Sequence, residues 1–159
     1  MILIALGANL NSSAGNLADT LHAALADLSQ HGIAVEAVSG FYKSPAWPDP
    51  SDPPFVNAVA RVATDLKPEA LLGVLHTTEA KFGRTRGAKN APRTLDLDLI
   101  DYDGAVATGR IELPHPRMDA RAFVLVPLRD LAPDWRHPVS GKSVDDLIAA
   151  LPAYRIEPL

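Results

Sequence analysis

Two carboxylates lie two residues apart in the segment Thr94-Leu95-Asp96-Leu97-Asp98-Leu99-Ile100. Because side chains alternate across a strand, this pattern predicts a strand with the leucines on one face and Asp96 and Asp98 on the other. Asp is a poor strand former and the two charges repel each other, so such a face calls for a compensating ligand. A pair of Mg²⁺ ions would supply it, since this cation prefers carboxylate oxygens and shares its sites with phosphates. The alternative is a solvated strand face.

A cluster of cations precedes this strand. Arg84, Arg86, Lys89 and Arg93 fall within ten residues. Arginine donates paired hydrogen bonds to phosphate oxygens, so a basic loop next to two carboxylates indicates a polyphosphate held between metal ions and guanidinium groups. The alternative is a solvated basic loop without a ligand.

His115 lies between two prolines, which restrict its backbone. This placement favours a contact with a phosphate or a proton transfer, although a lone histidine is more often structural. His76 and the remaining histidines have no metal-ligand spacing and are expected at the surface or in packing. The segment Gly141-Lys142-Ser143 is no P-loop, because Arg136 stands where that motif requires a glycine. A nucleotide site in this chain must therefore be built differently.

The composition excludes several classes of protein. With 159 residues, 47% apolar and 21% charged, the chain is expected to form one domain over residues 1–159. The absence of cysteine excludes a zinc ribbon, an iron–sulfur site, a disulfide scaffold and a thiol nucleophile. A net charge of −4 argues against a nucleic-acid binder, and no apolar run approaches the roughly 20 residues of a membrane span. The expectation is a cytoplasmic monomer.

Hydrophobic periodicity predicts the elements that must position these residues. Helix signals are Ser12 or Ser13 as the first N-cap, Pro68 at the second start and Ser143 as the last cap. The strands are expected over residues 2–6, 33–43, 55–64, 94–100 and 105–113, and the helices over residues 13–31, 68–82, 120–130 and after 143. This order predicts an α+β fold, a ferredoxin-like α/β sandwich with a mostly antiparallel sheet flanked by helices.

One long loop has an unusual composition. Five of the 14 prolines lie between Ser44 and Pro54. Proline cannot donate to a sheet ladder, so this segment is predicted to be a stiff loop outside the sheet. A long loop inside a compact domain is more often a binding loop than a plain connector, and we expect a functional role for it.

The chain resembles the 6-hydroxymethyl-7,8-dihydropterin pyrophosphokinase family of folate biosynthesis over essentially its whole length. The most specific match is the signature Lys89-Asn90-Ala91-Pro92-Arg93-Thr94-Leu95-Asp96-Leu97-Asp98-Leu99-Ile100. The supporting motifs are Gly7-Ala8-Asn9-Leu10, Phe41-Tyr42-Lys43-Ser44-Pro45, Phe55-Val56-Asn57-Ala58, Glu79 with Phe82-Gly83-Arg84, Pro114-His115-Pro116 and Arg121-Ala122-Phe123.

The resemblance implies an ATP-dependent diphosphotransferase that acts on 6-hydroxymethyl-7,8-dihydropterin and releases AMP and the dihydropterin diphosphate. It implies that Asp96 and Asp98 bind two Mg²⁺ ions and that Arg84, Arg93 and His115 act on the phosphates. The implied nucleotide-binding residues are His76, Glu79, Arg84, Arg93, Arg110, His115 and Arg121. The implied pterin-binding residues are Ser44, Trp47, Phe55, Asn57, Asp96 and Phe123.

Three positions depart from the family pattern. Ala8 stands where relatives often carry serine, Asn90-Ala91 stands where many have Trp-Gly, and Pro116 replaces an aromatic residue. We hypothesise that Trp47 takes over part of the closing role of the missing tryptophan. Two other functions stay open at this point: a two-metal nucleotidyltransferase or nuclease-like enzyme, and a non-catalytic nucleotide sensor on the same fold.

Overall fold

A computed structural model describes residues 1–46, 49–84 and 92–159. Its centre is an antiparallel sheet with strand order β5-β1-β4-β3-β6, in which β2 also pairs with β4. The strands are β1 (Ile2–Ala8), β2 (Ile33–Val38), β3 (Tyr42–Ser44), β4 (Phe55–Thr64), β5 (Asp96–Tyr102) and β6 (Glu157–Pro158). The helices are α1 (Leu17–Ser29), α2 (Pro68–Lys81), α3 (Ala122–Leu131) and α4 (Val144–Ala149), with a 3-10 turn at Met118–Ala120.

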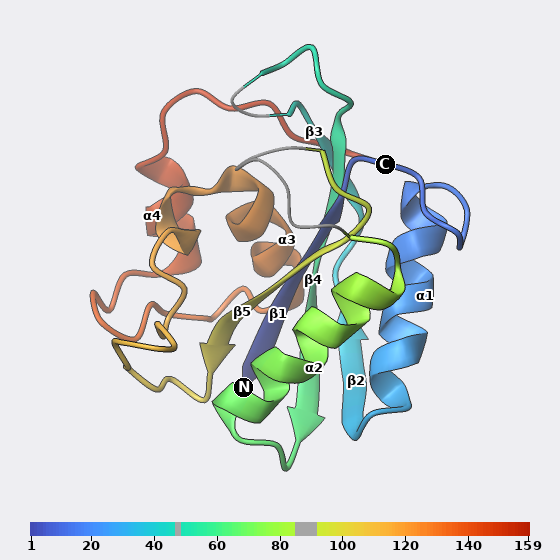
Figure 1. The fold of residues 1–159 in the computed structure, drawn as a ribbon. Coiled ribbons are helices and arrows are strands. Elements are labelled where there is room, and N and C mark those ends of the chain that lie inside the picture. The colour runs from blue at the N-terminus through green and yellow to red at the C-terminus, as the bar shows by residue number, and fades with distance from the viewer. Residues whose placement is uncertain (47–48, 85–91) are drawn as a thin grey trace.

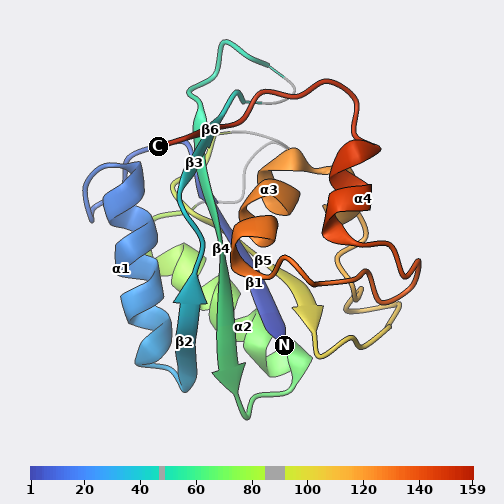
Figure 2. The ribbon, with the colours of Figure 1, turned by 180° about the vertical axis from the view of Figure 1, so that it is seen from behind.

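Helices cover both faces of the sheet (Figures 1 and 2). On one face, alternate residues of β1 such as Ile4 and Leu6 pack with the leucines of α1 and α2. On the other face, Leu3 and Ala5 pack with α3 and α4. The apolar run of β1 is thus buried on both sides, which explains why it does not alternate with polar residues. The predicted α+β sandwich with a mostly antiparallel sheet is confirmed.

The register of β5, β1 and β4 decides which residues lie on the α3 face. Leu97 and Leu99 of β5 belong to the core beneath α1 and α2, so Asp96 and Asp98 point to the opposite face, as the alternation predicts. Gly7 of β1 pairs with Asp96 on one side and with Asn57 of β4 on the other. Three positions of one row across the sheet are therefore a carboxylate, a glycine and an amide.

The first helix begins later than predicted. Its N-cap is Asn16, not Ser12 or Ser13. The Asn16 side chain accepts a hydrogen bond from the backbone N–H of Asp19 at 2.9 Å, and the Asp19 carboxylate accepts one from the Asn16 N–H at 3.2 Å. This reciprocal pair satisfies two backbone donors at once, which a lone serine does not. The predicted starts at Pro68 and after Ser143 are confirmed.

Three strand predictions are corrected. The expected strand 33–43 divides into β2 and β3, because the hydroxyl of Ser39 accepts the N–H of Val59 at 2.9 Å and replaces a carbonyl in the ladder. The expected strand 94–100 begins at Asp96. The segment 105–113 forms no strand and contributes one isolated bridge, between Ala107 and Leu113. The short β6, which pairs with β3, was not predicted.

In the described ranges, no helix is long and apolar enough to cross a membrane.

Candidate active site

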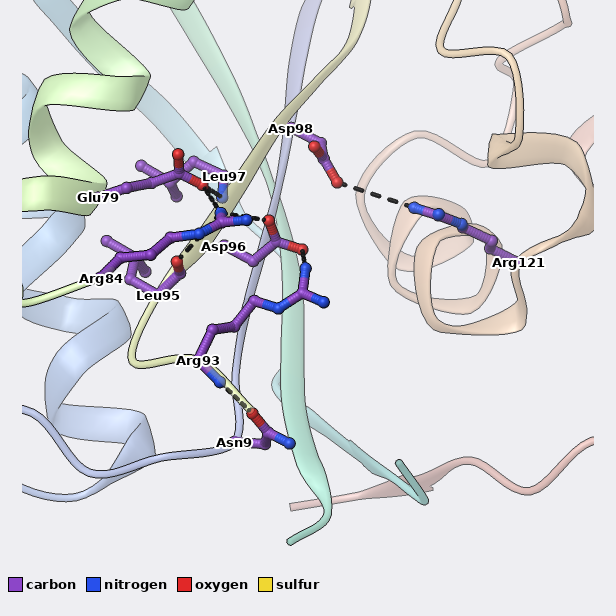
Figure 3. A network of polar contacts seen from close by, with 9 residues as sticks. All are labelled: Asn9, Glu79, Arg84, Arg93, Leu95, Asp96, Leu97, Asp98 and Arg121. Atoms are coloured by element: carbon purple, nitrogen blue, oxygen red, sulfur yellow. Dashed lines mark hydrogen bonds and ion pairs between the residues drawn. The ribbon is translucent and has the colours of Figure 1, made fainter. Parts of the chain in front are cut away.

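Asp96 is the centre of a polar network on the α3 face of the sheet, at the start of β5 (Figure 3). Its Oδ1 accepts a hydrogen bond from Nη1 of Arg84 at 2.9 Å, and its Oδ2 lies 3.2 Å from Nη1 of Arg93. Both guanidinium groups are largely buried. The fold thus brings together an acidic and a basic segment that the sequence suggested as partners, and places two cations on one carboxylate.

Asp98 lies one strand step away and faces a third cation. Nη1 of Arg121, just before α3, is 3.8 Å from Oδ2 of Asp98. Burial, together with the negative charge of Asp96, raises the pKa of Asp98 to about 6. A bound cation would favour the ionised form, so this carboxyl group is prepared to exchange a proton for a positively charged ligand.

Glu79 closes the network from the side of α2. Its Oε2 accepts hydrogen bonds from Nη1 of Arg84 and, at 2.9 Å, from the backbone N–H of Leu97. The side chain is 4% exposed. Burial raises the pKa of Glu79 to about 7, against the opposing effects of the Leu97 amide and of Arg84. Glu79 entered the candidate set through the family resemblance alone, because nothing in its local pattern indicates that it reaches β5.

The carboxylate oxygens at this site suit a Mg²⁺ ion that also binds oxygen atoms of a substrate. Asp96 and Asp98 offer carboxylate oxygens on one strand face. Over residues 1–46, 49–84 and 92–159, no group of three or more His, Cys, Asp or Glu side chains forms a closed metal cage. Magnesium usually keeps several waters and binds one or two carboxylates plus phosphate oxygens, so two aspartates are the expected protein share of such a site.

Asn9 joins three loops beside this network. Its Oδ1 accepts the backbone N–H of Arg93 at 2.8 Å, and its Nδ2 donates to the carbonyl of Pro53 at 3.1 Å. The backbone N–H groups of Asn9 and Leu10 both donate to the carbonyl of Arg93 at 3.1 Å. The loop after β1 therefore fixes the backbone of Arg93 and ties it to the end of the proline-rich loop. No local sequence pattern predicts this role for Asn9, because its partners lie 44 and 84 residues away.

His115 is held with a defined protonation pattern. Its backbone N–H donates to the carbonyl of Ile100 at 2.9 Å, and its Nδ1 accepts the N–H of Arg117 at 3.2 Å. Burial, together with the positive charges of Arg121 and Arg117, lowers the pKa of His115 to about 4. The side chain is therefore neutral near pH 7, with the proton on Nε2, and can donate a hydrogen bond but is poorly suited to act as an acid.

Gly7, which has no side chain, pairs with Asp96 in the sheet. A methyl group on Gly7 would approach Oδ1 of Asn57 to 3.1 Å and Cδ1 of Phe55 to 3.8 Å. Asn57 is 4% exposed, and its Nδ2 donates to Oγ of Ser44 at 2.8 Å. A side chain at Gly7 would thus crowd the Asn57 amide and approach the Phe55 ring, in the row of the sheet that also carries Asp96. Gly7 was not predicted as a site residue, because only the register shows its neighbours.

Phe123 lies in the first turn of α3, the helix that covers this face of the sheet. The guanidinium carbon of Arg121 is 5.4 Å from the centre of its ring, which is within the range of a cation–π contact. Phe123 also packs at the edge of the core beneath α3 and α4. The expectation that Phe55 and Phe123 enclose a flat ring stays a prediction.

Two of the other expected residues are exposed. His76 is exposed on α2, and Arg110 is exposed in the segment after β5. Their nucleotide contacts stay predictions. Trp47 lies outside the described residues, as do the loop residues Arg86, Lys89 and Asn90-Ala91. The hypothesis that Trp47 helps to close the site is untested for that reason.

Comparisons with known proteins give one consistent family. The chain matches the model of the 7,8-dihydro-6-hydroxymethylpterin-pyrophosphokinase (HPPK) family over residues 3–133. It is 42% identical over 159 residues to a 2-amino-4-hydroxy-6-hydroxymethyldihydropteridine pyrophosphokinase of Synechocystis sp., covering 99% of this chain and 79% of that protein. It is 38% identical over 155 residues to the protein of the same name from Methylorubrum extorquens, covering 97% and 95% of the two chains.

A solved structure shares the fold. The HPPK-DHPS protein of Plasmodium falciparum, crystallised with pteroate, superposes with a TM-score of 0.69 at 12% identity. The match covers 93% of this chain and 43% of that one, so this chain spans less than half of the bifunctional protein. At this identity the superposition carries the fold alone.

Proposed function

Because this chain belongs to the 7,8-dihydro-6-hydroxymethylpterin-pyrophosphokinase family, we propose that it transfers the pyrophosphoryl group of ATP to the 6-hydroxymethyl group of 6-hydroxymethyl-7,8-dihydropterin. The products are AMP and the dihydropterin diphosphate, and the reaction is a step of folate biosynthesis. The observation that carries the proposal is the pair Asp96 and Asp98 on one strand face, surrounded by the guanidinium groups of Arg84, Arg93 and Arg121.

The charges of the site suit this chemistry. Phosphoryl-type transfer depends mainly on positioning and on neutralising the charge of the phosphates. Asp96 and Asp98 would hold two Mg²⁺ ions, which would supply charge neutralisation at the phosphate chain. Arg84 and Arg93 already lie at hydrogen-bond distance from Asp96, so their guanidinium groups are placed to bind phosphate oxygens beside it.

His115 contributes as a neutral group. Since its Nδ1 is occupied by the Arg117 N–H, its Nε2–H is the donor that can reach a phosphate oxygen. Its lowered pKa keeps this proton in place near neutral pH, so we assign it a binding role and not the transfer of a proton.

The residues around Gly7 suit the pterin. Asn57 offers both donor and acceptor atoms at its edge, as the mixed edge of a pterin requires. Gly7 stands between Asn57 and Asp96 in the register, so a ring bound at Asn57 would direct its substituent towards the carboxylates. Phe55 and Phe123 are the aromatic groups available to cover its faces. This arrangement would bring the hydroxymethyl oxygen to the phosphate chain with little reorganisation.

The test is a ³¹P NMR experiment on the purified protein with Mg-ATP and 6-hydroxymethyl-7,8-dihydropterin. We expect AMP and a new diphosphate ester, and we expect Asp96→Asn and Asp98→Asn to abolish turnover while the proteins stay folded. Formation of ADP, or folded wild-type protein without turnover, would overturn the proposal and favour another transferase or a nucleotide sensor. The cytoplasmic location and the monomeric state stay predictions.

A further inference from the structure

Glu79 occupies an unfavourable place for a carboxylate. It lies in the last turn of α2 and is 3% exposed. The C-terminal end of a helix carries a partial negative charge, and a buried carboxylate is costly unless it is paired and hydrogen-bonded. The free-energy cost of burying this carboxylate must be offset by specific partners, and these partners indicate its role.

The first partner is Arg84, which Glu79 contacts through both its backbone and its side chain. The carbonyl of Glu79 accepts the backbone N–H of Arg84 at 3.2 Å, and its carboxylate pairs with Nη1 of the guanidinium group. Arg84 also binds Asp96. If Asp96 turns to another ligand, Arg84 loses one of its two carboxylates but keeps the other. Glu79 is thus the contact that holds this guanidinium group in place when Asp96 is engaged elsewhere.

The second partner is the backbone of β5. The N–H of Leu97 donates to Oε2 of Glu79 at 2.9 Å, and Leu97 is the residue between Asp96 and Asp98. β5 lies at the end of the strand order, so this amide faces outward from β1 and has no neighbouring strand in the described sheet. Glu79 caps that open edge, and it does so at the peptide whose orientation directs both aspartate side chains.

We infer that Glu79 is a positioning residue, which fixes Arg84 and the Asp96–Asp98 segment through one carboxylate oxygen and does not itself touch a substrate. The inference rests on the proposed function and deepens it. It assigns Glu79 a different role from the nucleotide contact that the family resemblance implied. Such supporting contacts around ligand-binding carboxylates typically contribute 10- to 100-fold to metal affinity or activity.

The test compares three variants. Glu79→Leu removes the acceptor, Glu79→Gln keeps an oxygen that can accept both hydrogen bonds, and Thr78→Val is the matched control. Thr78 is the neighbouring buried polar residue of α2, and it bonds Asp27 at 3.2 Å, away from the site. We would measure kcat, KM for ATP and the Mg²⁺ concentration for half-maximal rate. We would also record the ¹⁵N–¹H shift and hydrogen exchange of the Leu97 amide in protein without metal.

We expect Glu79→Leu to lower kcat by about 10- to 100-fold and to raise the Mg²⁺ requirement. The Leu97 amide should shift and exchange faster in this variant. Glu79→Gln should restore most of the kcat and of the Mg²⁺ affinity. Thr78→Val should change the stability and neither of these two quantities. Equal kcat and Mg²⁺ requirement in Glu79→Leu and wild type would overturn the inference, as would a loss of the same size in Thr78→Val.

Two further results keep the inference separate from folding and from the proposed function. If Glu79→Leu does not fold, hydrogen exchange of the Leu97 amide in the wild-type protein tests the inference. This amide should exchange slowly with and without Mg-ATP, and rapid exchange would refute the inference. Wild-type protein that forms no AMP refutes the proposed function, whereas active wild type with an equally active Glu79→Leu refutes only the role of Glu79.

Discussion

Substitution of Gly7 by alanine should weaken pterin binding. The backbone of Gly7 lies in β1 and lies outside the left-handed region that favours glycine, so alanine introduces no backbone strain there. The new methyl group would lie 3.1 Å from Oδ1 of Asn57, which is closer than nearly all ordinary contacts. The Asn57 amide must therefore give way by a few tenths of an ångström, and the methyl group also lies beside the amide where the ring edge would bind.

The size of the effect follows from these two changes. Overpacking of this kind costs about 1–3 kcal/mol, and here the cost falls on the group that would bind the ring edge. Since about 1.4 kcal/mol corresponds to a tenfold change, pterin affinity should fall by roughly 5- to 150-fold. In the free protein, alanine is favoured over glycine in a strand by roughly 0.5–1 kcal/mol, which offsets part of the crowding. The crowding that is not offset should lower the melting temperature as well, so stability is measured separately from affinity.

The assay is isothermal titration of each protein with the pterin in the presence of a non-hydrolysable Mg-ATP analogue, with the analogue titrated separately. The matched control is Gly73→Ala in α2, where an added methyl group meets no atom within 4 Å. This control should bind the pterin like the wild type. Unchanged pterin affinity in Gly7→Ala, or a loss confined to the nucleotide, would refute the placement of the pterin beside Gly7 and Asn57.

Three further predictions follow from contacts near the site. Trp135→Phe removes the indole N–H that donates at 2.9 Å to the buried carboxylate of Asp101, and should lower the free energy of unfolding by about 1.5–3 kcal/mol in urea titrations; a loss near zero would contradict this. The pKa of Asp98 is raised to about 6 in the native state. Between about pH 4 and 6 the native state therefore keeps a proton that the unfolded state has released, so the contribution of Asp98 to stability should fall as the pH rises through this range. Asp98→Asn should flatten this fall in melting curves, and an unchanged slope would count against the raised pKa. Asn9→Ala leaves the Arg93 N–H without its partner and should cost about 1–3 kcal/mol of stability, measured by urea unfolding; wild-type stability would show that the three loops are held by other contacts.

Much of the fold could be predicted because its signals are local. The alternation around Asp96 and Asp98 places both carboxylates on one face, and the apolar run of β1 predicts a buried strand. Proline at the start of α2 and Ser143 before α4 mark helix starts that the structure confirms. In each case the signal and the element lie within a few residues, so periodicity and capping chemistry suffice.

Two errors in the predicted elements arose where a side chain replaces a backbone partner. Asn16 and not an earlier serine caps α1, because its partner Asp19 completes a reciprocal pair. Ser39 interrupts a predicted strand by accepting a ladder hydrogen bond with its hydroxyl. Both residues are common in loops, and only the position of the second group shows that they end or divide an element.

By itself the sequence determined which residues carry charge, which strand presents the two aspartates and which family the motifs resemble. The tertiary structure alone decided that Gly7 lies between Asn57 and Asp96, and that Glu79 reaches the peptide between the aspartates. Alternation along a strand is fixed by the geometry of neighbouring residues. The register between strands and the approach of a helix to a sheet edge depend on how the whole core packs. They involve residues far apart in the sequence, so no local pattern predicts them.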